Sequence, residues 1–128
     1  MKPFKIEITT IEQCPDELKL QLPIQLPIKA EVVKQMPGKD RSDYMFAKLE
    51  SPVFWVDEAK DINTEISSFV ICSKFKGQTV DSAMKDLTIA IAYVVDDSAE
   101  FDNLLNLKKC QYVAVAKATA KSKWNIFG

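Results

Sequence analysis

The chain has 128 residues, of which 47% are hydrophobic and 27% are charged, and its 17 basic and 18 acidic residues give a formal net charge of −1. This length predicts one β-rich globular domain over residues 1–128, and the near-neutral charge argues against a dedicated binder of nucleic acid or of a membrane surface. The chain has neither a secretory signal pattern nor the ~20 consecutive apolar residues of a membrane-spanning helix, so we expect a soluble, cytoplasmic protein.

The first strand is predicted from alternation in the segment PFKIEITTI. Phe4, Ile6 and Ile8 fall on one face and polar residues fall on the other, which is typical of a half-buried strand. Residues 12–27 follow and contain three prolines. Because proline is unfavourable in a helix interior and removes donors from a central strand, we expect an extended connection along a sheet edge.

Within this connection the sequence LPIQLPI repeats Leu-Pro-Ile at a spacing of four residues. Proline fixes each triplet in an extended conformation, so the flanking apolar side chains can form a strip for another protein. We therefore predict partner contacts for Leu22, Ile24 and Leu26. The alternative is a covering segment that packs on the chain's own core, and burial of these side chains would overturn the contact strip.

The middle of the chain predicts two further strands separated by the turn signals of the sequence MPGKD. Alternation in the first strand places Ile28, Ala30 and Val32 on the inward face. The second strand runs through Leu49, and after an interruption at Ser51-Pro52 a short aromatic strand follows from Val53 to Val56. Pro52 indicates a bulge or an edge position there.

Two strands in the second half, within INTEISSFVICSKF and DLTIAIAYVVDD, are predicted to be apolar on both faces. A third segment, CQYVAVAKATAK, has mixed propensities, and its alternation favours a strand with Tyr112 and several alanines on one face. If the alanine faces of the last two strands lie on the same side, they form a shallow apolar surface. This surface could be covered by another part of the chain, by a second subunit or by a ligand.

Residues 98–109 change to a helical period, because Phe101, Leu104 and Leu105 recur at spacings of three and four. Ser98 is a suitable N-cap, so this segment predicts one short amphipathic helix. Six to seven strands, one short helix and no βαβ alternation predict a mainly β fold, with an antiparallel sheet curled into a barrel or sandwich.

The residue inventory excludes several chemistries. The chain has no histidine, which excludes Ser-His-Asp and Cys-His nucleophile systems and histidine metal sites. Its three glycines are too far apart for a G-x-G-x-x-G motif or a P-loop. The acidic groups at 57–61 and 96–102 are interpreted as a solvated turn and a helix start. No catalytic residue, metal ligand or cofactor is therefore predicted.

Four aromatic residues, Tyr44, Phe54, Trp55 and Tyr93, are the candidate ligand-binding residues, because together they can line an apolar cavity; the alternative is that they are core.

The missing catalytic motifs, the Leu-Pro-Ile repeat and the strongly apolar strands favour a non-catalytic protein-interaction module. An immunity-type protein and a self-associating accessory protein both fit, so the expected partner is another protein, with a homodimer or other homo-oligomer among the alternatives. The second hypothesis is a small-molecule-binding β-barrel or a carboxylate-dependent enzyme built on one. A closed pocket with a desolvated acid would favour that second hypothesis.

Overall fold

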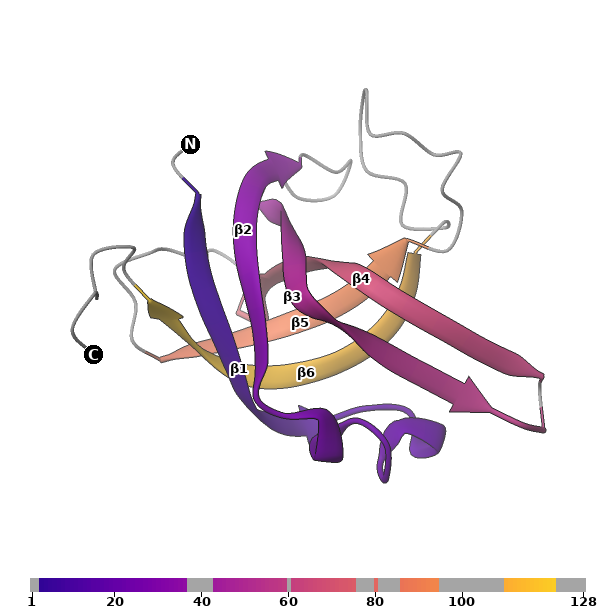
Figure 1. The fold of residues 1–128 in the computed structure, drawn as a ribbon. Helices are drawn as coiled ribbons and strands as arrows, with labels where there is room; N and C mark the ends of the chain where they lie inside the picture. Colours follow the sequence, from indigo (N-terminus) through magenta and orange to yellow (C-terminus); the bar gives the residue numbers. More distant parts are fainter. Residues whose placement is uncertain are drawn as a thin grey trace.

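The computed structural model describes residues 3–36, 43–59, 61–75, 80, 86–94 and 110–121. Within them lie six strands and two short 3-10 helices, which Figure 1 labels in chain order. The elements are β1 (Phe4–Gln13), η1 (Asp16–Leu18), η2 (Pro23–Gln25), β2 (Ile28–Met36), β3 (Tyr44–Asp57), β4 (Ile62–Ser73), β5 (Leu87–Val94) and β6 (Cys110–Lys121). The helix predicted in residues 98–109 lies outside the described residues.

The six strands form one closed antiparallel barrel. Each strand pairs with the next one along the chain, and β6 pairs with β1 to close the circle. The predicted mainly β fold with an antiparallel sheet is therefore confirmed, and its architecture is the barrel. Closure matters because it gives the first and the last strand a hydrogen-bonding neighbour on both sides.

The first two strands bury the faces that their alternation predicts. Ile6 of β1 lies opposite Ala30 of β2, and both side chains are buried. The predicted inward residues are all in the core: Phe4, Ile6, Ile8, Ile28, Ala30 and Val32.

Inside the barrel, bulky side chains of β5 lie opposite alanines of β6. The facing pairs, all buried, are Leu87 with Ala118, Ile89 with Ala116 and Ile91 with Ala114. A barrel of few strands has a narrow interior, so a small residue opposite each large one lets the two strands approach closely without overfilling the core. The alanines of β6 are thus covered by the chain itself.

The alanines of β5 lie on the other side of the sheet. Ala90 and Ala92 alternate with the inward isoleucines and face the outside of the barrel. Because the two sets of alanines are on opposite faces, the shallow surface that would combine them is not formed.

A bulge in β6 separates Tyr112 from the alanines that follow it. Ile91 pairs with Ala114 but the next residue, Ala92, pairs with Tyr112, so Val113 is the extra residue. Val113 is buried in the core, whereas Tyr112 is exposed. The prediction that Tyr112 shares a face with the alanines is wrong, because one inserted residue reverses the alternation on one side of the bulge.

β3 and β4 continue beyond the body of the barrel as a hairpin. Their register shifts between Lys48 and Val53, where Pro52 predicts an interruption. Beyond the shift, residues 53–57 pair with residues 62–66. We call this hairpin the β3–β4 arm, and Figure 1 shows it extending away from the other strands.

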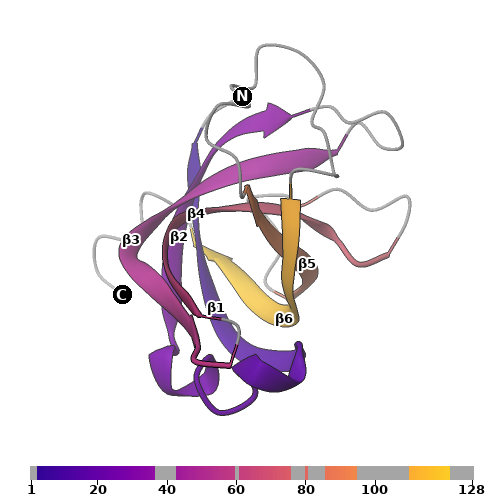
Figure 2. The same ribbon diagram turned by 90° about the vertical axis from the view of Figure 1, so that its right-hand side faces the viewer.

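The connection between β1 and β2 contains helical turns in residues 16–25, so the expectation of an extended segment is wrong there. η1 begins directly after Pro15, and η2 begins at Pro23. Proline is tolerated at these positions because the first N–H groups of a helix have no intrahelical acceptor. Figures 1 and 2 both place η1 and η2 at one end of the barrel, on the side where β3 enters the β3–β4 arm.

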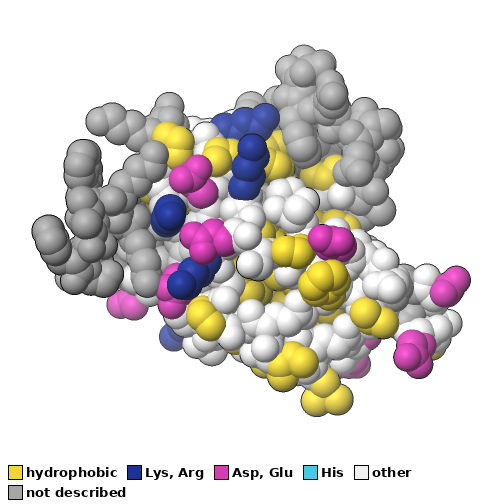
Figure 3. Space-filling view, viewed as in Figure 1, with side chains coloured by type: hydrophobic (Ala, Val, Ile, Leu, Met, Phe, Trp, Pro, Cys, Tyr) yellow, Lys and Arg dark blue, Asp and Glu magenta, His cyan; other side chains and the backbone are white. Residues whose placement is uncertain are grey.

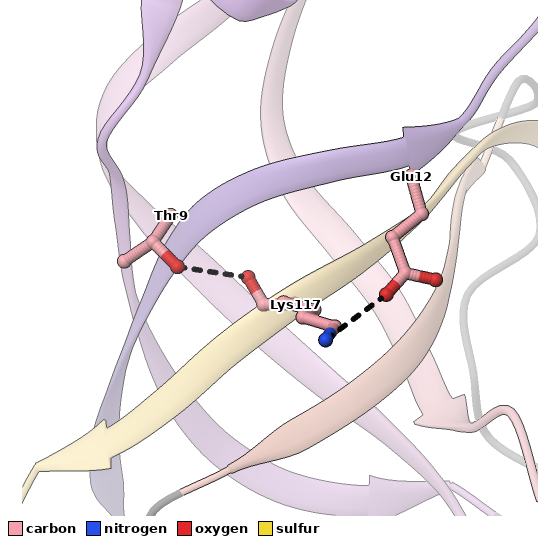
Figure 4. Close-up of polar contacts among 3 residues, drawn as sticks. All are labelled: Thr9, Glu12 and Lys117. Atoms are coloured by element: carbon pink, nitrogen blue, oxygen red, sulfur yellow. Dashed lines mark hydrogen bonds and ion pairs between the residues drawn. The ribbon is translucent and has the colours of Figure 1, made fainter.

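The β1–β6 seam closes the barrel across two register shifts. Thr9 Oγ1 donates a hydrogen bond to the carbonyl of Lys117 at 3.5 Å, and Lys117 Nζ lies 3.7 Å from Glu12 Oε1 (Figure 4). Exposed contacts of this kind contribute little free energy. Burial on the inner face dominates at the seam, where Ile8 lies opposite Ala118.

Candidate functional site

The helical connection at the end of the barrel has three faces with different neighbours. The backbone N–H of Leu22 donates to the carbonyl of Leu18 at 2.9 Å, so residues four apart lie on the same face. Three such pairs are present: Leu18 with Leu22, Gln21 with Gln25, and Leu20 with Ile24. Leu18 and Leu22 are buried in the barrel core and close this end of it.

The two glutamines bind the backbone of β3. The N–H of Val56 donates to Gln21 Oε1 at 2.8 Å, and Gln21 Nε2 donates to the carbonyl of Val56 at 2.6 Å. Gln25 makes the same pair of bonds with Phe54. The N–H of Phe54 donates to Gln25 Oε1 at 2.8 Å, and Gln25 Nε2 donates to the carbonyl of Phe54 at 3.0 Å. Each side-chain amide therefore satisfies one donor and one acceptor that a neighbouring strand would otherwise satisfy.

This arrangement leaves four large apolar side chains at the surface. Leu20 is 86% exposed and Ile24 is 83% exposed, while Phe54 and Val56 on the adjoining strand are 46% and 38% exposed. We call these four residues the apolar patch. In the view of Figure 3, hydrophobic side chains gather on the lower part of the molecule, where η1, η2 and the arm lie in Figure 1.

Polar and charged groups border the apolar patch. Lys19 Nζ lies 2.8 Å from Asp16 Oδ1, which lowers the pKa of Asp16 and raises that of Lys19. The turn of the arm carries two described carboxylates, those of Glu58 and Asp61. Glu58 and Asp61 of this turn are exposed. The patch is thus flanked by an acidic tip.

A separate pocket of about 280 Å³ lies on the outer face of the sheet. Its lining residues are Tyr44, Val70, Cys72, Ala90, Ile91, Ala92, Cys110 and Tyr112, from four neighbouring strands. Burial raises the pKa of both the Cys110 thiol and the Tyr112 hydroxyl, so these groups are neutral near pH 7. We call this site the outer pocket, and the described residues that line it include no carboxylate.

Trp55 and Tyr93 meet inside the barrel. Their ring centroids are 6.0 Å apart with an interplanar angle of 64°, an edge-to-face contact. Trp55 is buried, and its Nε1–H has no hydrogen-bond partner in the part of the chain that the structure describes. Trp55 belongs to the core cluster and Tyr93 packs against it, so the pair is part of the packed core.

The four predicted ligand-binding residues occupy three places. Tyr44 lines the outer pocket, Phe54 belongs to the apolar patch, and Trp55 lies with Tyr93 in the interior. They do not line one cavity, because Phe54 and Trp55 are adjacent in a strand and point to opposite faces.

The three predicted partner-binding residues are also separated. Leu22 is 1% exposed, Leu26 is half-buried against the core, and Ile24 alone is fully at the surface. A continuous strip of all three is therefore absent, because helical turns, not an extended chain, place alternate residues on different faces. Sequence reasoning missed Leu20 and the two glutamines, although their four-residue spacing in ELKLQLPIQ is a helical signal.

Among the described residues, no group of three or more histidines, cysteines or acids is arranged to hold a metal ion. The acidic group at 96–102 lies outside them. No helix in the described part of the chain is long and apolar enough to cross a membrane.

Comparison of the chain with models of protein families, with curated proteins and with solved structures finds no match in any of the three.

Proposed function

We propose that this protein is a non-catalytic protein-binding module that contacts its partner through the apolar patch. The observation that carries the proposal is the exposure of Leu20 and Ile24, two large aliphatic side chains, on turns whose Gln21 and Gln25 bind the backbone of β3. The β3 residues that these glutamines bind, Val56 and Phe54, are exposed as well. Single exposed apolar residues need no explanation, but a contiguous group bordered by charges is typical of a protein-interaction site.

The patch is held in place before any partner binds. Gln21 and Gln25 tie the connection to β3, and Leu18 and Leu22 anchor the same turns in the core. A preordered surface loses little conformational entropy on association. Each aliphatic side chain that a partner covers fully contributes roughly 1.5–3 kcal/mol of hydrophobic free energy before the entropic cost of association is subtracted.

The charges around the patch define the chemistry of the partner. An apolar ridge that fills the patch and carries lysine or arginine beside it would meet the acidic tip at Glu58 and Asp61. Such rim charges mainly accelerate association, and their effect falls with added salt.

The experiment compares proteins retained from an extract of the source organism by immobilised wild-type chain and by variants. The double variant Leu20→Ser, Ile24→Ser removes the centre of the patch, and Phe75→Ser is the matched control, because Phe75 is an exposed aromatic elsewhere on the barrel. We expect at least one partner protein to be retained in equal amounts by wild type and by Phe75→Ser. The double variant should retain at least about tenfold less of that protein. Equal retention by all three would contradict the proposal, provided that thermal unfolding shows equal stability.

A second function, binding of a small apolar molecule, is favoured by the outer pocket. Its volume of about 280 Å³ is just below the usual range for ligand sites, and its lining is mostly apolar. Ala90→Leu would fill it from the half-exposed outer face of β5. The fluorescence of anilinonaphthalene sulfonate should rise with wild type and with Thr10→Leu, an exposed control, but not with Ala90→Leu. Equal signals from all three would contradict this function.

A further inference from the structure

One edge of the β3–β4 arm has no partner strand among the described residues. β4 pairs with β3 along one side from residue 62 onward, but on its other side it pairs with β5 only from Val70 to Ser73. The backbone of residues 62–69 on that side is therefore a free edge within the described chain. The opposite edge of the arm, on β3, is occupied by Gln21 and Gln25.

The glutamine contacts reveal which β4 residues offer hydrogen bonds at the free edge. Both the N–H and the C=O of Phe54 bind Gln25, so these groups point away from β4. In an antiparallel ladder the residue directly opposite then points its own N–H and C=O away as well. Phe54 lies opposite Glu65, and Val56 lies opposite Asn63. Asn63 and Glu65 thus present their backbone groups at the free edge of β4.

We propose that the free edge of β4 pairs with the same edge of a second copy of this chain, antiparallel and with the two-fold axis at Thr64. In this register Asn63 lies opposite Glu65 of the second copy, and Glu65 lies opposite Asn63 of the second copy. Both are positions whose N–H and C=O point outward, so each pair exchanges two backbone hydrogen bonds. The contact is the same on both chains, as two-fold association requires.

Charge selects this register over its neighbours. An axis at Glu65 would place two identical carboxylates directly opposite each other, and an axis at Asn63 would place Asp61 opposite Glu65. Like charges in facing positions destabilise a strand pair. With the axis at Thr64, each Glu65 faces a neutral amide on the same outer face, where both side chains are exposed. This match of the edge with itself is the reason for assigning a second copy as the occupant.

The direction of the strands leaves room for both barrels. β4 runs from the tip of the arm toward the body of the barrel, and the arm extends beyond the other strands (Figure 1). In an antiparallel pair centred at Thr64, the two bodies therefore lie at opposite ends of the shared segment. The product is a continuous four-stranded sheet that carries both copies of Phe54 and Val56 on one face.

The experiment is sedimentation velocity of the whole chain over a concentration series up to about 1 mM, because a short strand pair buries less surface than a stable interface needs. We expect the average mass of wild type to rise from the monomer value of 14.5 kDa as concentration rises. Asn63→Lys should lower the dissociation constant about three- to tenfold, since it faces Glu65 of the second copy, and Asn63→Glu should raise it by a similar factor.

Thr10→Lys and Thr10→Glu are the matched controls, because Thr10 is exposed on β1, outside the arm. They should leave the dissociation constant unchanged. The opposite responses of the two Asn63 variants separate this register from association through the apolar patch, which would depend on Leu20 and Ile24 instead. A wild type and an Asn63→Lys variant that both stay at 14.5 kDa would overturn the proposal, and so would equal responses to both charges.

Discussion

The body of the barrel and the β3–β4 arm satisfy their strand edges in different ways. In the body, each strand has a neighbouring strand on both sides, and the sheet closes where β6 pairs with β1. In the arm, side-chain amides from the helical connection replace the neighbouring strand on β3, and the β4 side offers a free edge among the described residues.

This difference shows two solutions to the same hydrogen-bonding requirement. A strand neighbour satisfies the backbone at every second residue, whereas Gln21 and Gln25 satisfy only Val56 and Phe54. The amides also block this edge against an added strand, which is a way to prevent aggregation. The β4 edge, which has no such cover among the described residues, is the one that we propose to pair with a second chain.

The largest expected effect comes from the helical connection that supports the arm. Leu22→Ala should lower the free energy of unfolding by about 3 kcal/mol, because it leaves a cavity where a fully buried side chain closes the barrel. Leu20→Ala is the matched control and should change it by less than about 0.5 kcal/mol, since Leu20 is almost fully exposed. Urea unfolding of both variants measures the difference. Equal losses of unfolding free energy would contradict the placement of Leu22 in the core and of Leu20 at the surface.

A smaller effect is expected in the body. Ala116→Leu should destabilise the chain by about 2 kcal/mol, because the added side chain has to fit opposite buried Ile89 in a filled interior. Lys117→Leu, on the next residue and the outer face, should change stability by less than about 1 kcal/mol. Thermal unfolding of the two variants tests whether the interior is filled as described, and equal losses would show that it is not.

The smallest effect is expected at the sealed edge. Gln21→Ala and Gln25→Ala should each lower stability by about 1 kcal/mol, because each leaves one backbone donor and one acceptor to water at a partly exposed edge. Gln13→Ala, at an exposed position on β1, should have no measurable effect. Urea unfolding measures the losses, and light scattering should show faster aggregation of the two edge variants. Unchanged aggregation would mean that the amides do not protect β3.

Much of the barrel follows from alternation alone. The predicted inward residues of β1 and β2 are confirmed, because Phe4–Ile8 pairs with Ile28–Val32 without a register shift and the period of two is kept over that stretch. The face of Tyr112 was predicted wrongly, since the bulge at Val113 is created by the register of β6 against β5 and has no local signal. The apolar patch was predicted only in part, at Ile24, because three prolines suggested an extended chain where short helical turns form.

The sequence by itself determined that this chain forms an antiparallel β structure without histidine-based chemistry, because the pattern of apolar residues and the residue inventory are local properties. Only the tertiary structure decided that the sheet closes as a barrel, that the alanines of β6 face the isoleucines of β5, and that Gln21 and Gln25 seal the edge of β3. These features depend on which strands become neighbours, and strand pairing joins residues up to 116 positions apart, as between Lys5 and Lys121.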